Sequence, residues 1–221
     1  MIRTQNLCKI FGRGTNKIEA VKDVTLSIKK GETVAIVGKS GAGKSTLLHI
    51  MSGLDRPSSG KVFLNNVDVY KINEQKRARL RNRKIGFVYQ FYNLLPDLTA
   101  LENVMLPAMI GKISSRKQIK RKAEYLLYDV GLENRSKHVP STLSGGEAQR
   151  VAIARSLIND PEIILCDEPT GNLDTVTSQQ IQELLFKINK QKGMTLVIVT
   201  HNLNGDNHFD RVIEIRDGRI I

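Results

Sequence analysis

The sequence has 221 residues and a formal net charge of +12, so it can form one sizeable core but is short for two full domains, and its charge favours an anionic partner. Only two cysteines are present, Cys8 and Cys166, both in apolar stretches, which argues against a disulfide framework and for a reducing compartment. No apolar run reaches the ~18 residues that a spanning helix needs, and the first residues lack a signal-peptide pattern, so we expect a protein that reaches a membrane only through another polypeptide.

Two strands are predicted at the start of the chain, from Ile2 to Phe11 and from Val21 to Ile28, with a polar loop between them. Phe11 stands where the first strand meets this loop. An aromatic ring in this place can stack on an adenine base, but a phenylalanine at a strand end more often belongs to the core. Both interpretations stay open at this point.

The next stretch holds the pattern that organises the chain. A strand at 33–37 runs into G-x-x-x-x-G-K-[ST] and then into a helix that continues to Leu54, an order typical of a phosphate-binding loop. Glycines allow a left-handed backbone that turns successive N–H groups toward one anion, and the helix adds the positive end of its dipole. Lys44 suits the β- and γ-phosphates of a nucleotide, and the Ser45 hydroxyl suits Mg²⁺. The predicted phosphate-site residues are Gly38, Lys39, Ser40, Gly41, Ala42, Gly43, Lys44, Ser45 and Thr46.

The middle of the chain is predicted to be mostly helical. A hairpin around Asn65-Asn66 and a basic helix at 76–84 precede a strand at 85–89, which ends on Gln90. A glutamine at the carboxyl end of a parallel strand is placed to reach a ligand. Helices follow at 100–109 and 115–130, with a second basic run at 116–122. A solvated helix face is the simplest interpretation of both basic runs.

A second anion-binding arrangement is predicted where Ser144-Gly145-Gly146 forms a turn before a helix at 148–158. One domain rarely needs two phosphate sites for one nucleotide. The second site therefore suggests contact with a partner subunit's nucleotide, and hence a dimer.

Acidic and imidazole side chains follow two further predicted strands. The apolar run 163–166 leads to Asp167 and Glu168, which suit Mg²⁺ binding and general-base catalysis respectively, although paired acids in loops are usually only solvated. Asn172-Leu173-Asp174 opens another helix, and a strand at 195–200 ends at His201, which can reach a γ-phosphate. A short hairpin from Val212 closes the chain.

With these motifs in this order, the chain resembles the ATP-binding subunit of ABC transporters over essentially its whole length. The correspondence assigns 38–45 to Walker A, Gln90 to the Q-loop, 143–147 to the LSGGQ signature, 163–167 to Walker B, Glu168 to the catalytic glutamate, 172–174 to the D-loop and His201 to the switch histidine. Finer strings at 85–96 and 168–174 resemble one branch, the ATPases of lipoprotein-release, macrolide-export, bacitracin-resistance and cell-division systems.

The resemblance implies a single α/β domain of the P-loop NTPase (RecA-like) class. Its mostly parallel core, 1–90 with 151–221, would carry an antiparallel β subdomain and an inserted helical subdomain at 91–150. It implies an ATPase that uses ATP and Mg²⁺, forms a homodimer around ATP, and drives a separate membrane permease from the cytoplasmic face. No specific nucleic acid is expected as a partner.

The implied roles divide the site residues into groups. Catalysis falls to Lys44, Gln90, Glu168 and His201; ATP binding to Phe11 with the phosphate-site residues; the partner's ATP to Leu143, Ser144, Gly145, Gly146 and Glu147; D-loop contacts to Asp174; and Mg²⁺ to Ser45, Gln90 and Asp167.

Three departures from the family pattern stand out. Phe11 replaces the commoner tyrosine, Cys166 replaces another small or apolar residue, and the segment after His201 lacks the usual aspartate. Two rival functions are weighed: a soluble ABC-type ATPase acting on nucleic acid or the ribosome, and a scaffold that binds ATP without hydrolysis. No coiled-coil insertion, second ATPase cassette or aromatic-rich basic groove is found in the sequence, which argues against the first function. Intact Glu168, Gln90 and His201 argue against the second. The transported substrate and its direction stay open.

Overall fold

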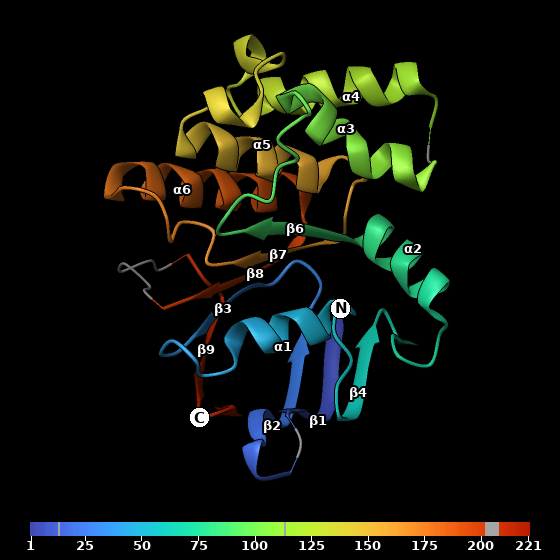
Figure 1. Cartoon of the computed structure of the whole chain (residues 1–221), viewed down its shortest axis with the longest axis vertical. Coiled ribbons are helices and arrows are strands. Elements are labelled where there is room, and N and C mark those ends of the chain that lie inside the picture. Colours follow the sequence, from blue (N-terminus) through green and yellow to red (C-terminus); the bar gives the residue numbers. More distant parts are fainter. Residues whose placement is uncertain (13, 113, 202–207) are drawn as a thin grey trace. The chain divides into compact units, whose positions relative to one another are not determined.

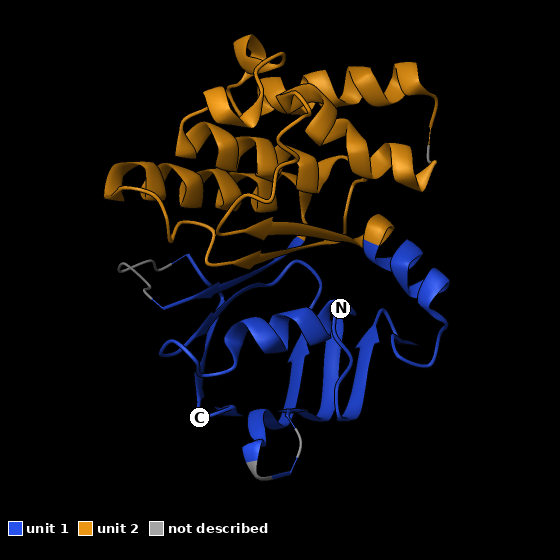
Figure 2. Ribbon diagram, viewed as in Figure 1, with its two compact units in different colours: residues 1–81, 195–221 blue, residues 82–194 orange. Residues whose placement is uncertain are grey.

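The computed structural model describes residues 1–12, 14–112, 114–201 and 208–221 (Figure 1). Two compact units divide the chain, one of residues 1–81 with 195–221 and one of residues 82–194 (Figure 2). Both contain strands and helices, which confirms the predicted α/β class. The finer boundaries predicted for a core and a helical subdomain stay a prediction. Among the described residues, no helix combines the length and apolarity that crossing a membrane requires.

The first unit contains an antiparallel sheet near its N-terminus. Its strand order is β2 (Ile18–Ile28), β1 (Ile2–Phe11), β4 (Ser59–Leu64) and β5 (Val67–Asp68). The predicted Asn65-Asn66 hairpin is confirmed: both residues have positive φ, 48° and 66°, as the twist of a two-residue turn requires. Strand β2 starts three residues earlier than predicted, because Ile18 pairs with Phe11 although its side chain is exposed.

Parallel strands form the buried part of the same unit. Strand β3 (Thr33–Val37) lies between β8 (Thr195–Thr200) and β9 (Arg211–Arg216) and is parallel to both. Strands β3 and β8 are buried almost throughout, which explains their continuous apolar sequences. The predicted closing hairpin is confirmed by β10 (Arg219–Ile220), which pairs antiparallel with β9.

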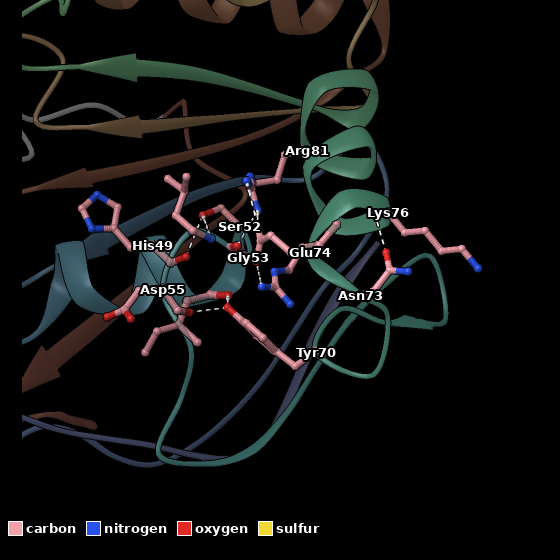
Figure 3. Close-up of polar contacts among 12 residues, drawn as sticks. His49, Ser52, Gly53, Asp55, Tyr70, Asn73, Glu74, Lys76 and Arg81 are labelled. Carbon is pink, nitrogen blue, oxygen red and sulfur yellow. Dashed lines mark hydrogen bonds and ion pairs between the residues drawn. The ribbon is translucent and has the colours of Figure 1, made fainter. Parts of the chain in front are cut away.

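Helix α1 (Lys44–Met51) is three residues shorter than predicted, because the chain leaves the helix at Ser52 and Gly53 has a φ of 77°. Figure 3 shows Tyr70 directed toward Asp55 and Arg81 directed toward Gly53, at the C-terminal end of this helix. The Tyr70 hydroxyl contacts the carbonyl oxygens of Ile50, at 2.6 Å, and of Asp55, and Arg81 Nη1 donates to Gly53 O at 2.8 Å. These contacts join the last turn of α1 and the residues that follow it to Tyr70 and Arg81, so the end of α1 is anchored.

The basic run beside α1 lies on α2 (Glu74–Lys84) and is not wholly a solvated face. Arg77 is only 4% exposed; it pairs with Glu74 and its guanidinium lies 5.4 Å from the centre of the Tyr70 ring. Burial raises the pKa of Tyr70, so its hydroxyl stays a donor. The expectation of a solvated helix is therefore wrong for Arg77, whose stem packs under Gly53.

The second unit pairs two parallel strands, β6 (Ile85–Tyr89) and β7 (Ile163–Asp167). Their register sets Tyr89 opposite Asp167, so the residues that follow, Gln90 and Glu168, leave the two strands at the same edge. Strand β6 also lies close to the helix that contains Ser156, since a Cβ on Gly86 would come within 2.6 Å of the Ser156 carbonyl oxygen.

Four helices make up most of the rest of this unit: α3 (Ala100–Gly111), α4 (Arg116–Asp129), α5 (Gly145–Leu157) and α6 (Thr175–Lys192). Figure 1 shows them gathered on one side of β6 and β7. The predicted end of α4 at Gly131 is confirmed. Gly131 has a φ of 75° and donates to Tyr128 O, while Leu132 donates to Leu127 O, the pair of bonds that ends a helix in a Schellman motif.

Candidate functional site

The predicted phosphate loop connects β3 to α1, and its glycines have the backbone that the sequence predicts. Their φ angles are 156°, 79° and 100° at Gly38, Gly41 and Gly43. A Cβ on Gly43 would lie 2.0 Å from Ala20 O, and one on Gly38 would lie 2.2 Å from Ile215 O. Nothing lies within 4 Å of a Cβ on Gly41, so glycine is favoured at this position by the positive φ angle and not by a lack of space.

Lys44 lies in the first turn of α1 and folds back over the loop. Its side chain is buried, and Nζ donates to Gly38 O at 2.8 Å and to Lys39 O at 3.1 Å. The ammonium is thus held by the carbonyls of the loop itself. Gly43, at the N-cap position of α1, has no side chain to accept from the first N–H groups, a capping role that a bound anion can take.

Two other segments hold the phosphate loop, and the sequence did not reveal either. The Ala20 carbonyl of β2 touches Gly43, as the clash above indicates. Gly218, in the turn between β9 and β10, donates to Ala42 O at 3.1 Å and accepts from Lys22 N at 2.8 Å. The loop is therefore fixed by backbone contacts to segments far away in the sequence, and only the turn residues Asp217-Gly218 gave a local signal.

Phe11 is not a core residue, because 43% of it is exposed at the end of β1. The alternative that it belongs to the core is therefore wrong. His201 follows β8 and is also exposed. Of the segment that departs from the family pattern after His201, residues 202–207 lie outside the described part of the chain.

Gln90 is held by a residue of the predicted D-loop. Its Nε2 donates to Asn172 Oδ1 at 3.0 Å, and Asn172 Nδ2 donates back to Gln90 O at 3.3 Å. Gly171 permits this contact, since a Cβ there would lie 2.7 Å from Gln90 Nε2. These two residues are 82 positions apart, so no local pattern pointed to the pair.

The paired acids stand at the end of β7. Asp167 is the last residue of the strand, and Glu168 has a φ of 47°, a left-handed backbone unusual for a side chain of this size. Gly171 N donates to Glu168 O at 3.0 Å and closes the turn. Such strained positions cost about 1 kcal/mol or more and gather at functional sites, where they turn a side chain away from the strand direction. The preceding Cys166 is fully buried, and burial raises the pKa of its thiol, as expected for a packing residue.

Asp174 begins helix α6 as predicted. Its carboxylate accepts from Thr177 N at 3.0 Å, and hydrogen bonds from Thr177 lower the pKa of this acid. Within the ranges that the structure describes, no three His, Cys, Asp or Glu side chains gather into a metal-binding group.

The signature segment differs from the prediction. Helix α5 begins at Gly145 and not at Ala148, so the two glycines lie in its first turn and form no separate loop. Their role is close packing: a Cβ on Gly145 would lie 2.8 Å from the Tyr92 hydroxyl, and one on Gly146 would lie 2.6 Å from Thr177 Cγ2. Ser144 is the N-cap, which confirms that the segment opens a helix.

Glu147 completes the cap of α5. The Ser144 N–H donates to Glu147 Oε2 at 2.8 Å, the Glu147 N–H donates to Ser144 Oγ at 3.2 Å, and Arg135 Nε contacts Glu147 Oε1 at 2.7 Å. The Arg135 hydrogen bond, with help from Ser144, lowers the pKa of Glu147 to about 2. This carboxylate therefore stays ionised in all but strong acid.

The capped start of α5 predicts a pH dependence. A lowered pKa stabilises the fold above the unfolded value of about 4.3, and this contribution is lost as the pH falls toward the folded value of about 2. We expect Glu147→Gln to have a lower urea midpoint than the unsubstituted protein at pH 6. The difference between the two midpoints should become smaller as the pH is lowered from 4.5 to about 2. Glu133→Gln, at an exposed position nearby, is the matched control. A gap that does not change with pH would contradict this role.

Two residues that the sequence did not single out support these loops. Arg155, on α5, donates to Tyr92 O at 2.6 Å and to Asn93 O, two residues that follow the Q-loop with positive φ. Gln149, wholly buried, donates to Tyr89 O at 3.3 Å and to Pro169 O, so it joins the ends of both strands. Their helical positions look like ordinary surface or core positions in the sequence.

Comparison with known proteins decides the family. The ABC transporter family model matches residues 21–171, more than half of the chain. The chain belongs to the ABC transporter family. The lipoprotein-releasing system ATP-binding protein LolD of Syntrophus aciditrophicus is 51% identical over 221 residues, covering 100% of this chain and 99% of that protein. LolD of Legionella pneumophila is 48% identical over 220 residues, with 100% and 96% covered.

Solved structures of ABC transporter proteins agree with this fold. A dimeric, post-hydrolysis state of the ATP-binding cassette MJ0796 bound to ADP and Pi matches with a TM-score of 0.92 and 43% identity, covering 100% of this chain and 96% of that one. The cbiO1 protein of Clostridium perfringens, part of the ABC transporter complex cbiONQ, matches with a TM-score of 0.86 and 29% identity, covering 100% and 86%.

The predicted ABC transporter ATP-binding subunit and its ATPase fold are thereby confirmed. At the level of the family, ATPase chemistry and a membrane permease as partner are confirmed as well. The rival function on nucleic acid or the ribosome finds no support in these ABC transporter relatives. The roles of individual residues stay predictions.

Proposed function

We propose that this ABC transporter subunit works as an ATP-bound homodimer that drives a permease of the lipoprotein-release type. The observation that carries this proposal is the 51% identity to LolD over the whole length of both chains. The family as a whole shares the ATPase motifs, so it is the high identity over the full length of both chains that favours this branch. The subunit would act at the inner face of the membrane, where the permease holds it.

The nucleotide-binding role falls to the phosphate loop and Phe11. The N–H groups of Gly38 to Thr46 and the start of α1 would meet the phosphates, and Lys44 would exchange its contacts with Gly38 O and Lys39 O for the β- and γ-phosphate oxygens. The exposed ring of Phe11 would stack on adenine. The place of Gly43, where any Cβ would overlap backbone, supports a loop shaped for one ligand.

Mg²⁺ is proposed to accompany ATP. The residues predicted to hold it, Ser45, Gln90 and Asp167, offer hydroxyl, amide and carboxylate oxygens, a donor set that suits this hard cation. Gln90 fits the role because its amide nitrogen is directed to Asn172 and its amide oxygen is the atom that a cation prefers. When bound, the ion neutralises charge on the phosphates.

Hydrolysis is proposed to rest on Glu168 as the base that takes a proton from the attacking water, with His201 donating to the γ-phosphate. The left-handed backbone at Glu168 supports this role, since it turns the side chain out of the strand direction at the edge where Gln90 also emerges. Lys44 and Gln90 would hold the phosphates and the ion while the bond breaks.

Dimer formation is proposed to use the start of α5. Leu143, Ser144, Gly145, Gly146 and Glu147 would face the ATP held by the partner's phosphate loop, and Asp174 would lie in the same interface. The dimeric MJ0796 structure supports this, as does the positive end of a thirteen-residue helix with an N-cap hydroxyl that can still donate. The predicted helical subdomain, 91–150, would carry the motion to the permease.

A pull-down tests the proposal. Glu168→Gln, tagged and loaded with ATP, is used to capture partners from gently solubilised membranes of the native host; the same variant without ATP is the control. We expect an integral membrane permease of the lipoprotein-release type to co-purify when ATP is present. Recovery of only nucleic-acid or ribosomal proteins would overturn the proposal, and a permease of another transporter branch would remove the lipoprotein assignment.

A further inference from the structure

A lysine lies against the ring that is proposed to stack on adenine. Lys9 precedes Phe11 by two positions on β1, so both side chains leave the same face of the strand. The Lys9 ammonium lies 4.8 Å from the centre of the Phe11 ring. A cation at this distance is attracted to the electron-rich face of an aromatic ring, so it favours one orientation of Phe11.

The ammonium is itself fixed in place. Lys9 Nζ contacts Asp55 Oδ1 at 2.7 Å and donates to Arg56 O at 2.7 Å. The Lys9 side chain is only 12% exposed, unlike the usual surface ion pair, whose two mobile side chains contribute little. Among the described residues, the Lys9 ammonium thus contacts a carboxylate, a backbone carbonyl and an aromatic ring, and these contacts restrain its position.

These contacts connect the ring to the phosphate loop. Asp55 follows α1, the helix whose first turn carries Lys44, and its N–H donates to His49 O at 3.2 Å; Figure 3 shows both His49 and Asp55 at this end of the helix. In the pairing of β1 with β2, Phe11 lies opposite Ile18. Two residues further along β2 is Ala20, whose carbonyl touches Gly43. The strand that carries Phe11 is thus tied both to Gly43 in the phosphate loop and to the C-terminal end of α1.

Phe11 is still 43% exposed although Lys9 lies over one face of its ring, so the exposed surface belongs to the remainder of the ring. Building on the proposed stacking role of Phe11, we propose that Lys9 is a positioning residue for the nucleotide base. It holds the ring by one face and presents the other face to adenine. Its effect therefore falls on the base and not on the phosphates.

The test separates base from phosphate. Dissociation constants for ATP and for inorganic tripolyphosphate, both with Mg²⁺, are measured by titration calorimetry on the full chain. We expect Lys9→Met, which keeps the apolar stem, to weaken ATP binding by roughly fivefold and to leave tripolyphosphate binding unchanged. Lys9→Arg, which keeps the charge, should restore most of the affinity. Lys61→Met, at an exposed lysine of the neighbouring strand β4, is the matched control.

A double substitution distinguishes this proposal from the stacking role on which it rests. In a Phe11→Ala background, Lys9→Met should have no further effect on ATP binding, because the ring through which it acts is gone. Weaker ATP binding in Phe11→Ala with no change in Lys9→Met would overturn the positioning role and leave the stacking role intact. Unchanged binding in Phe11→Ala would overturn both.

Two further outcomes are decisive. If Lys9→Met weakens ATP and tripolyphosphate equally, Lys9 only supports the phosphate loop and the proposal is wrong. If Lys9→Met fails to fold, Asp55→Asn takes its place, because it keeps the lysine but removes the carboxylate that holds it. This variant should weaken ATP about twofold to fivefold and leave tripolyphosphate unchanged; equal ATP affinity would overturn the proposal.

Discussion

Glu168→Gln is expected to reduce ATP turnover by at least ~100-fold while ATP still binds, because an amide of the same size cannot accept the proton of the attacking water. Glutamine fits the site of Glu168 as well as the acid does, including its left-handed backbone, so the turn after β7 should keep its shape. The phosphate loop is untouched by this change. Since hydrolysis is what separates the proposed dimer, the variant should accumulate as an ATP-bound dimer.

Phosphate release and size-exclusion chromatography with and without ATP measure the two effects. The matched control is Glu183→Gln, an exposed acid on α6 whose side chain accepts a hydrogen bond from Gln179 of the same helix, and it should behave as the unsubstituted protein does. A Glu168→Gln protein that hydrolyses ATP at the normal rate would contradict the role of this acid. Loss of ATP binding itself would show that the carboxylate supports the nucleotide site instead.

The sequence predicted elements well where a local pattern determines them. The strands β3, β6 and β8 have the predicted bounds, because each is a buried apolar run that ends at a glycine, a glutamine or a histidine of the site. The end of α4 at Gly131 and the start of α6 at Asp174 were likewise predicted, since helix caps depend on residues within one turn.

Predictions failed where contacts between distant segments determine the structure. Gln149 in α5 is an example. In the sequence it looks like any polar helix residue, and only the folded structure shows that it is buried and donates to the carbonyls of Tyr89 and Pro169. The signature glycines gave a misleading local signal. Glycine suggested a turn before the helix, whereas neighbours from Tyr92 and Thr177 require small residues inside its first turn.

The prediction of a solvated face for the basic run 76–84 was partly wrong for the same reason, contacts between distant segments. Charge runs are usually solvated, but Arg77 is buried because its guanidinium lies near the Tyr70 ring and its stem packs beneath Gly53. The contacts of Tyr70 and Arg81 with the end of α1 belong to the same cluster. A basic segment thus supports the helix that opens with Lys44, a role that net charge alone does not indicate.

Lys44→Ala is expected to weaken ATP binding by at least ~10-fold, because it removes the one buried ammonium of the predicted phosphate site among the residues described. In the structure the Lys44 ammonium is held by Gly38 O and Lys39 O, contacts that are replaced readily by the stronger, charge-assisted contacts of a phosphate. The loss should fall on ATP and tripolyphosphate alike. This distinguishes Lys44 from Lys9, whose effect is expected on the base alone.

Lys30→Ala provides the matched control, since Lys30 is an exposed lysine outside the phosphate loop, and a solvated charge contributes little. Titration calorimetry gives the affinities, and thermal unfolding without nucleotide shows whether the loop carbonyls that lose a donor destabilise the fold. If Lys44→Ala loses ATP turnover but keeps its ATP affinity, the ammonium acts only while the phosphate bond breaks. That result would contradict the binding role proposed for Lys44. An equal loss in Lys30→Ala would mean that the net charge of the protein, and not the buried position of Lys44, attracts the nucleotide.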